Sequence, residues 1–499
     1  MSAIETFLAV LFVLVVAIAV TSKGALKGPE AFALRWTVLS LAVAISGLAA
    51  WLRWKMSQPQ EGANQARAAA VPQLSSHSPA TAAAEVAAAS RHAIVFRQHF
   101  PPRHGTPALS FFGGAPIAPR GFQWPRPIGD RAPSAPFSFL LQIDCAAVPP
   151  AGRRGLLPDR GVLYFFLDLT WGEPHAFRVL YADAQDAERW TVVEPPGDLR
   201  PAFGDQAVRM WKWTQSPADC PKLLPKWTFD PVVIDLPVPR RDQDEEADAP
   251  VLWPGEKRTA EALRAAQGEE VPGNWFTVRD FTSDDGRLRR PFASYPHDWR
   301  AMQICSGLVA DRLRDTHGLR GTGAALRDRS DAERDALRIQ IRAEALGWFS
   351  QAAGEPPFAA VPQAERDRFW SWLEAYPWLV RFVITEAVTL SIEASLVESQ
   401  EAAARIPADV VRRVHHRHAL AVRAEQGLFA SSPDRMLAPP VDVQGNQWDR
   451  ARTHLLLLEL SSNGALGHEF GEGVYQFWIT PADLRARRFD KVTLTADAY

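Results

Sequence analysis

The chain has 499 residues, of which 47% are hydrophobic and 22% are charged. Its 55 Lys and Arg residues nearly balance 57 Asp and Glu residues, so the formal net charge is only -2. Nucleic acid is therefore not expected as a partner, because no global positive field draws in a phosphate backbone. Three cysteines, Cys145, Cys220 and Cys305, exclude a disulfide framework and a zinc site made of cysteine alone, and leave one disulfide open.

The amino-terminal region carries two apolar stretches. Phe7 to Val20 is an unbroken apolar run, and Trp36 to Leu52 contains no charged residue and has tryptophans at its edges. Each stretch approaches the roughly 20 residues that span a bilayer, and tryptophan favours the headgroup level. We expect helices over about 3–22 and 36–54, which form a transmembrane hairpin at 1–56 and make the lipid bilayer a partner.

The alternative for the first stretch is a cleaved signal peptide, since Ala17-Ile18-Ala19 mimics a small-residue cleavage site. Glu5, rather than Lys or Arg, precedes the apolar run, which favours the transmembrane helix. Lysines follow the first helix, whereas almost equal positive charge follows the second. The charge pattern thus predicts a bacterial inner-membrane protein with a weak preference for a periplasmic soluble domain, and does not decide the side.

A flexible linker and a folded domain follow the hairpin. Residues 57–92 are rich in Ala, Ser, Pro and Gln and contain no aromatic residue, so they bury too little apolar surface to fold alone. From 93 to 499 we expect an α+β domain with a mixed or antiparallel sheet. Alternating apolar runs predict strands at 137–144, 161–169, 177–183, 190–196, 453–462 and 473–481.

Helical periodicity dominates the block from about 296 to 424. The expected helices run over about 298–315, 331–351, 364–375, 380–404 and 407–424. Ser330 with Glu333 forms a capping box, and Pro407 suits a first helical position. The acidic run at 242–248 before this block is interpreted as a solvated loop.

Two strand pairs resemble each other within the chain. "FLLQID" followed by "GVLYFFL" near the start is similar to "LLLLEL" followed by "GVYQFWI" near the end. This similarity leaves two interpretations open, a duplicated strand pair within one fold or a chance likeness of apolar strands. In the first, Asp144 and Glu459 end equivalent strands.

The segment "FFGGAPIAPRGFQWPRP" and the strands after it resemble the amino-terminal half of the YwqG-like domain family, which is bacterial and uncharacterised. The matching positions are Gly113, Gly114, Pro116, Pro119, Gly121, Trp124, Pro125, Phe139, Leu140, Gln142, Ile143, Asp144, Leu157, Pro158 and Gly161. The ending "HLLLLELSS" to "GVYQFWITPADL" is also similar, whereas Ala438 and Pro439 replace two family glycines in "MLAPPVDVQ". The resemblance covers about three fifths of the chain and implies a family without known catalysis.

Three candidate motifs favour ordinary structural explanations. His415, His416 and His418 point in different directions on a helix, so a solvated basic face is favoured over a metal site. Cys145 lies on the strand face opposite Asp144, so the acid does not readily activate it. The glycines of 317–326 follow no strand and precede no lysine, which excludes a phosphate loop. We expect no metal and no cofactor.

The remaining polar candidates lie at strand ends and in irregular loops, where sheet proteins often place ligand contacts. The proposed pocket lining consists of Trp124, Gln142, Asp144, Gln444 and Glu459. The favoured function is a membrane-anchored, non-enzymatic domain that binds an unknown protein or small molecule, and an immunity-like role is included. The alternative is an enzyme that uses the carboxylates near Asp144 and Glu459 as acid and base.

Overall fold

The computed structural model describes residues 86, 92–104, 109–127, 135–169, 176–183, 189–235, 256–268, 276–319, 326–420, 433–441, 447–468, 470 and 473–497. The chain divides into two compact units, Met1–His77 and Ser78–Tyr499, and all described residues belong to the second. The hairpin predicted over 1–56 lies outside the described residues, as does nearly all of the predicted linker. In the described part, no helix is both long and apolar enough to cross a bilayer.

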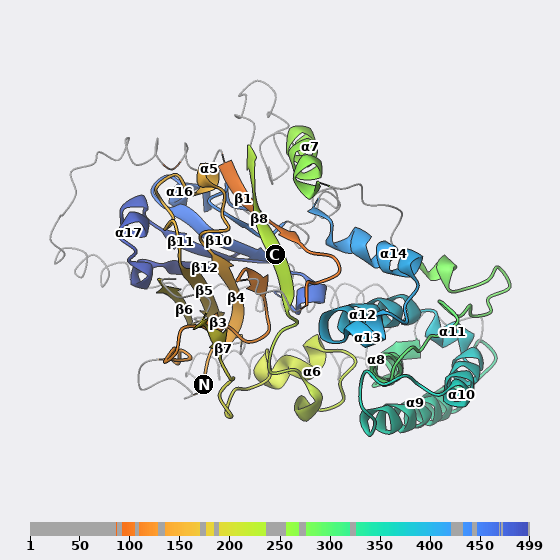
Figure 1. The fold of residues 1–499 in the computed structure, drawn as a ribbon. Coiled ribbons are helices and arrows are strands. Elements are labelled where there is room, and N and C mark those ends of the chain that lie inside the picture. Colours follow the sequence, from red (N-terminus) through yellow and green to blue (C-terminus); the bar gives the residue numbers. More distant parts are fainter. Residues whose placement is uncertain are drawn as a thin grey trace, which may run out of the picture. The chain divides into compact units, whose positions relative to one another are not determined.

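The second unit contains one large sheet of ten strands in the order β12-β11-β10-β9-β1-β8-β2-β4-β5-β6 (Figure 1). All described neighbours in this sheet pair antiparallel, so the expected α+β class holds with an antiparallel sheet. The strands are β1 (His92–Gln98), β2 (Phe111–Phe112), β4 (Ser138–Asp144), β5 (Val162–Leu167), β6 (Phe177–Ala182), β8 (Trp227–Asp235), β9 (Arg435–Met436), β10 (Leu455–Ser461), β11 (Val474–Ile479) and β12 (Thr493–Asp497). A separate two-stranded sheet joins β3 (Ile117–Ala118) to β7 (Thr191–Val192).

The strand pair β4–β5 and the strand pair β10–β11 have the same register. Strands β4 and β5 pair Phe139 with Phe166 and then shift by one residue before Leu141. Strands β10 and β11 pair Leu456 with Trp478 and shift before Leu458. A bulge inserts one extra residue at one point of a ladder, so a bulge at the same point in both pairs aligns them residue by residue.

Matching hydrogen bonds support this alignment. The backbone N–H of Ile117 donates to Gln142 Oε1 at 2.7 Å, and that of Val441 donates to Glu459 Oε2 at 2.9 Å. A side chain on β4 therefore holds the segment that follows β2, and a side chain on β10 holds the segment that follows β9 in the same way. Gln142 and Glu459 occupy equivalent positions.

A second pair of bonds corrects one prediction from the sequence. The backbone N–H of Asp144 donates to Ser110 Oγ at 3.0 Å, and that of Ser461 donates to Asp434 Oδ1 at 2.9 Å. Asp144 is thus equivalent to Ser461, and the expected equivalence of Asp144 and Glu459 was wrong by two residues. The sequence alone does not reveal this offset, because the strands are runs of similar apolar residues and the position of the bulge is not visible in them.

The sheet thus consists of two repeats, one made of β1, β2, β4, β5 and β6 and the other of β8, β9, β10, β11 and β12. The first strand of each repeat lies beside the second strand of the other. β1 pairs with β9, β8 pairs with β2, and β1 and β8 pair with each other in the middle of the sheet. The contact of β1 with the β9 segment matches the contact of β8 with the β2 segment. Phe96 N donates to Asp434 O at 3.2 Å, and Phe229 N donates to Ser110 O at 3.2 Å. Arg97 and Asp230 stand opposite each other at the centre of this arrangement.

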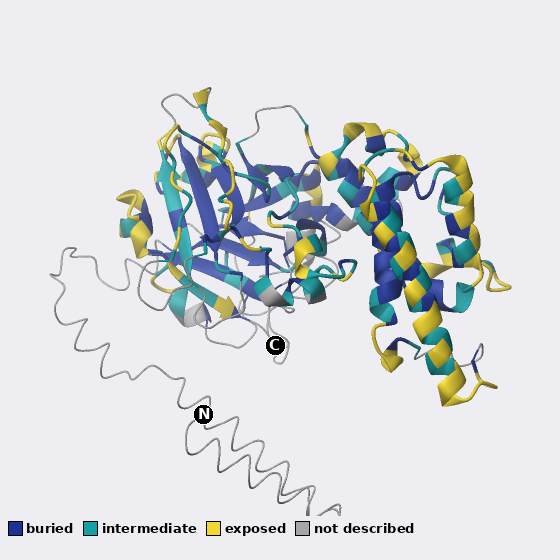
Figure 2. Ribbon diagram, turned by 90° about the horizontal axis from the view of Figure 1, so that it is seen from below, coloured by how far each residue is buried: buried dark blue, intermediate teal, exposed yellow. Residues whose placement is uncertain are grey.

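The sheet folds back on itself around one apolar core. The rings of Phe165 on β5 and Phe477 on β11 lie 5.3 Å apart, and Phe177 on β6 lies 5.7 Å from Phe477. In a flat sheet the seven strand spacings between β5 and β11 would separate them by about 34 Å. The inner faces of the two repeats therefore pack against each other, and the strands are mostly buried (Figure 2).

Helices form a second core and cover part of the sheet. The helical block contains α8 (Trp299–Arg312), α9 (Asp331–Ala353), α10 (Gln363–Glu374), α11 (Pro377–Val380), α12 (Ile384–Glu398), α13 (Gln400–Ala403) and α14 (Ala408–His418). Further α-helices in the described part of the chain are α5 (Pro150–Arg153), α6 (Ala207–Met210), α7 (Glu256–Gln267), α16 (Gln447–Arg450) and α17 (Pro481–Arg485). α7 lies against β8 on the outer face of the central strands (Figure 1).

The predicted helical block agrees with the structure in most of its boundaries. The capping box of Ser330 and Glu333 is present at the start of α9. The single helix expected over 380–404 is interrupted, because Ser399 is extended and its side chain accepts from Ala402 N to begin α13. Pro407 is the N-cap of α14 rather than its first residue.

Replacing Phe477 with Ala should lower the free energy of unfolding by about 3–5 kcal/mol, because the ring is fully buried where the two repeats meet. Urea unfolding of Phe477→Ala checks this expectation. Ile339→Ala is the matched control, since Ile339 on α9 is 55% exposed and its loss should cost below about 0.5 kcal/mol. Equal effects of the two substitutions would contradict the described core.

Candidate functional site

Trp124 and Gln142, two of the residues predicted to line a pocket, lie on the outer face of the first repeat. Trp124 packs edge-on against Phe166 and its Nε1–H donates to the Phe137 carbonyl at 2.8 Å. Gln142 is buried, and its Nε2 donates to the Leu109 carbonyl at 3.1 Å while its Oε1 accepts from Ile117. Gln142 binds two backbone groups of the irregular segment at 109–127, and Trp124, which belongs to that segment, binds the backbone just before β4. Both side chains therefore anchor this segment on the sheet.

Gly113 shows why this segment needs glycine. Its φ is +57°, and a Cβ placed there would lie 2.1 Å from the carbonyl oxygen of Pro225. The close approach to a neighbouring backbone excludes any side chain.

Asp144 closes β4 in a local turn. Its Oδ1 accepts from Ala146 N at 2.9 Å, and partial burial raises the pKa of the carboxyl group against the lowering effect of this bond. Burial raises the pKa of the adjacent Cys145 thiol to about 12. Cys145 is therefore a protonated core residue at neutral pH, as expected for an inert cysteine.

Glu459 belongs to a buried polar network on the outer face of the second repeat. Its Oε1 lies 2.6 Å from Arg435 Nη2, and both side chains are fully buried. Gln476 Nε2 donates to Glu459 Oε2 at 2.8 Å, and Thr495 Oγ1 donates to Gln476 Oε1 at 3.2 Å. Burial raises the pKa of Glu459, and the charge of Arg435 opposes that rise.

The structure does not bring the two predicted carboxylates together. Asp144 on β4 and Glu459 on β10 are separated by five strand spacings, about 24 Å along the sheet. Because the sheet folds back on itself, the outer faces of the two repeats point away from each other. This geometry does not favour an acid and base pair made of Asp144 and Glu459, and Gln444 lies outside the described residues.

The histidines of α14 are buried rather than solvated. His418 Nε2 lies 3.0 Å from Glu393 Oε1, and Trp227 stacks on the His418 ring at 4.4 Å. The His415 ring stacks on Phe100 at 4.7 Å. The expected solvated basic face was therefore wrong for these two residues, because the helix docks against the central strands. No group of three or more metal-ligating side chains occurs among the described residues.

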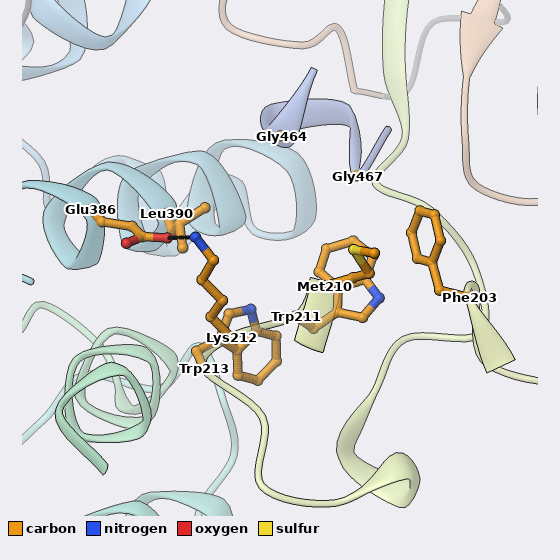
Figure 3. Close-up of a pocket in the computed structure, with 9 residues that line it drawn as sticks. All are labelled: Phe203, Met210, Trp211, Lys212, Trp213, Glu386, Leu390, Gly464 and Gly467. Atoms are coloured by element: carbon orange, nitrogen blue, oxygen red, sulfur yellow. Dashed lines mark ion pairs between the residues drawn. The ribbon is translucent and has the colours of Figure 1, made fainter. Parts of the chain in front are cut away.

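A small pocket lies where three distant segments of the chain meet (Figure 3). Its lining comes from the segment around α6, from α12 and from the turn after β10. The lining residues are Phe203, Met210, Trp211, Lys212, Trp213, Glu386, Leu390, Gly464 and Gly467. The cavity measures about 90 Å³, well below the roughly 300–1,000 Å³ that encloses a drug-sized ligand. It therefore has the size for one side chain or a comparable group.

Local backbone geometry places the indole ring in this pocket. Trp211 ends α6, where its N–H donates to the Ala207 carbonyl at 2.8 Å. Gly467 has a φ of +69°, and a Cβ at this residue would lie 2.5 Å from the Trp211 ring. The glycine thus provides the space that the ring occupies beside the turn.

Polar groups sit at the rim of the apolar lining. Lys212 Nζ lies 4.0 Å from Glu386 Oε1, with the two side chains 60% and 44% exposed. Figure 3 shows Lys212 extending from the tryptophan segment toward α12. Trp211 Nε1 is buried and has no hydrogen-bond partner among the described residues. A long, exposed ion pair contributes little stability, so its two charges are available to other groups.

Sequence reasoning missed this pocket. The sequence signal was "WKW" at 211–213, two tryptophans around a lysine in a chain with 18 tryptophans. The partners of this segment come from residues more than 170 positions later, and no local pattern predicts that meeting.

The fold and the pocket define a two-repeat antiparallel-sheet domain with a helical insertion and a small aromatic pocket. Residues 110–284 and 380–498 match the family described as "Domain of unknown function (DUF1963)". These ranges span more than half of the chain, so the protein belongs to that family, and the sequence-based prediction of an uncharacterised domain is confirmed. The interval 285–379 between them holds α8, α9, α10 and all but the last residue of α11, whereas the whole lining of the aromatic pocket lies inside the matched ranges. A search of curated proteins finds no match.

Glu459→Gln should lower the free energy of unfolding by about 3–5 kcal/mol, because it removes the carboxylate opposite the buried Arg435 guanidinium. The double variant Arg435→Phe with Glu459→Gln copies the first repeat, which has Phe111 and Gln142 at these positions. It should be more stable than the single variant. Urea unfolding of both proteins is the measurement, and a double variant less stable than Glu459→Gln would contradict the alignment of the repeats.

Proposed function

We propose that this domain is a non-enzymatic protein-interaction module that receives one apolar side chain of a partner in the pocket of Figure 3. The observation that carries the proposal is the combination of indole, phenyl and thioether walls with an exposed ion pair at the rim. Tryptophan is enriched among the residues that dominate binding energy, and such anchors fill small, well-packed pockets.

The charged residues at the rim of the pocket determine which partner segment is favoured. Lys212 and Glu386 flank the apolar walls with opposite charges, so the favoured partner segment carries an acidic and a basic residue around its apolar anchor. Charge pairs at an interface rim mainly orient the partner and raise the association rate. An enzymatic role has no comparable support, since Lys212 and Glu386 form an exposed ion pair at the rim rather than a buried acid and base.

A phage library of random 12-residue peptides tests the proposal on the full chain in detergent. Enriched peptides should share one apolar anchor, and Leu390→Glu should weaken their binding at least about tenfold, because it places a charge in the apolar wall. Fluorescence anisotropy of a labelled peptide measures this loss. The matched control is Ile339→Glu on the exposed face of α9, which should bind like the wild type.

Two results would contradict the proposal. One is a library that enriches no peptide above background, and the other is equal binding by Leu390→Glu and Ile339→Glu. Melting temperatures of both variants within about 2 °C of the wild type establish that the fold is retained.

We infer in addition that the apolar stretches at about 3–22 and 36–54 anchor the chain in a bacterial inner membrane, with the folded domain on the periplasmic side. The support is the sequence pattern alone, together with the resemblance to YwqG-like bacterial proteins. The lysines after the first helix favour a cytoplasmic loop between the helices.

Reporter fusions after Tyr499 test this orientation. A reporter active only in the periplasm should be active, and one that fluoresces only in the cytoplasm should be dark. Replacing Lys23 and Lys27 with Gln should reduce the periplasmic signal, because the loop loses positive charge. A bright cytoplasmic reporter would refute the hairpin orientation.

A further inference from the structure

A second, polar cavity lies at the centre of the sheet, on the outer side of β1 and β8. It measures about 300 Å³, which reaches the lower end of the range for small-molecule sites. Its lining consists of Arg97, Gln98, His99, Phe100, Pro101, Arg103, Asp230, Gln267 and Gly268. The strand β1 and the loop after it supply six of these residues, the end of α7 supplies two and β8 supplies one.

Asp230 organises the floor of this cavity. Its Oδ2 lies 3.1 Å from Arg97 Nη2 and 2.9 Å from His99 Nε2. Burial raises the pKa of Asp230, but the hydrogen bonds from His99 and Arg97 outweigh it and lower the pKa below its ordinary value. The carboxylate is therefore ionised at neutral pH and holds the guanidinium and the imidazole side by side.

The two ring nitrogens of His99 lie close to Thr228 and Asp230. Its Nδ1 lies 2.9 Å from Thr228 Oγ1, and that oxygen accepts from Arg103 N at 3.1 Å. Thr228, His99 and Asp230 resemble a hydrolase triad, but Thr228 is only 2% exposed and does not line the cavity. These contacts position residues rather than activate a nucleophile.

The charged lining is positive. Arg97 and Arg103 contribute two cations to the lining, and Asp230 contributes one anion. Arg97 Nη1 donates to the Ala266 carbonyl at 3.2 Å, which fixes its guanidinium at the end of α7. Gly268 has a φ of +75°, and a Cβ there would lie 2.9 Å from Arg97 Nη1. A side chain at position 268 would therefore crowd the Arg97 guanidinium.

Arg103 differs from Arg97 in that it does not pair with Asp230. Its side chain is exposed, and it has no ion pair among the described residues, whereas its backbone N–H makes the structural bond to Thr228. A guanidinium that lines a polar cavity and binds no carboxylate has all its N–H donors available. Such a group favours phosphate and carboxylate ligands, which accept two parallel hydrogen bonds.

We propose that this central cavity binds a small oxyanion, a phosphate or carboxylate group, between Arg103 and Arg97, with Asp230 accepting from a hydroxyl or amine of the same ligand. The proposal is independent of the partner pocket in Figure 3, since the two cavities share no lining residue. The structure favours an oxyanion over a cation because the single carboxylate of the lining already holds Arg97 and His99.

Isothermal titration calorimetry of the full chain in nonionic detergent tests this site, with inorganic phosphate and acetate as separate probes. At least one probe should bind saturably, and added salt should weaken the binding. Arg103→Gln should weaken it at least about tenfold by removing a charge-assisted contact, because its backbone bond to Thr228 is kept. Arg329→Gln, at an exposed arginine outside the cavity, is the matched control.

Asp230→Asn supplies the opposite test, because it removes the negative charge of the lining and should tighten binding of the same probe. Binding of phosphate alone identifies a phosphate-bearing ligand, and binding of acetate alone identifies a carboxylate. The proposal is overturned if neither probe saturates at concentrations up to about 10 mM. It is equally overturned if Arg103→Gln, with an unchanged melting temperature, binds as tightly as Arg329→Gln.

Discussion

The fold depends on the pairing of β1 with β8 at the centre of the sheet. Each of these strands starts one repeat but completes the hydrogen-bonded ladder of the other, so neither repeat has a continuous sheet of its own. Arg97 and Asp230 stand opposite each other at the centre of this exchange and are joined by an ion pair. The partly exposed pair alone adds little stability, and the strength of the centre comes from the ladder and from the apolar residues inside it.

The two repeats keep their backbone bonds and differ in the side chains on their outer faces. Tyr164 in the first repeat and Gln476 in the second both donate to the loop that follows the short strand, at 3.0 and 2.7 Å. The first outer face is otherwise aromatic, whereas the second contains Arg435 and Glu459. Buried charges of this kind do not by themselves indicate stability or catalysis, because removing one of them costs more than replacing both.

Much of the architecture was predictable from local patterns. The helical block, the capping box at Ser330 and the strand at 161–169 follow from periodicity and capping rules, since these elements depend on nearby residues. The strand β8 was not predicted, and its Pro231 is a residue that central strands usually exclude. The structure tolerates it, because Pro231 stands opposite Phe96, whose N–H points to β9, and β2 pairs only with Trp227 and Thr228.

The candidate sites were less predictable for a physical reason. Trp124, Gln142 and Glu459 carry recognisable polar or aromatic signals, but in the structure they hold loops on the sheet. The aromatic pocket and the central cavity each combine segments that are far apart in the chain, and only the tertiary fold defines their charge and volume. The type of a residue predicts which ligand groups it can bind, whereas the tertiary fold decides whether several such residues lie close enough to form a site.

The strand exchange also sets an order for biosynthesis. Ile94 pairs with Met436, so the β9 side of β1 stays unpaired until residues near the end of the chain have left the ribosome. The helical block between them relies on local contacts, and such contacts form fast, whereas pairings between distant strands form slowly. During that interval β1 exposes an unpaired edge, which is a template for pairing with other chains. Expression yield should therefore depend on chaperones that cover this nascent strand more than on the stability of the finished domain.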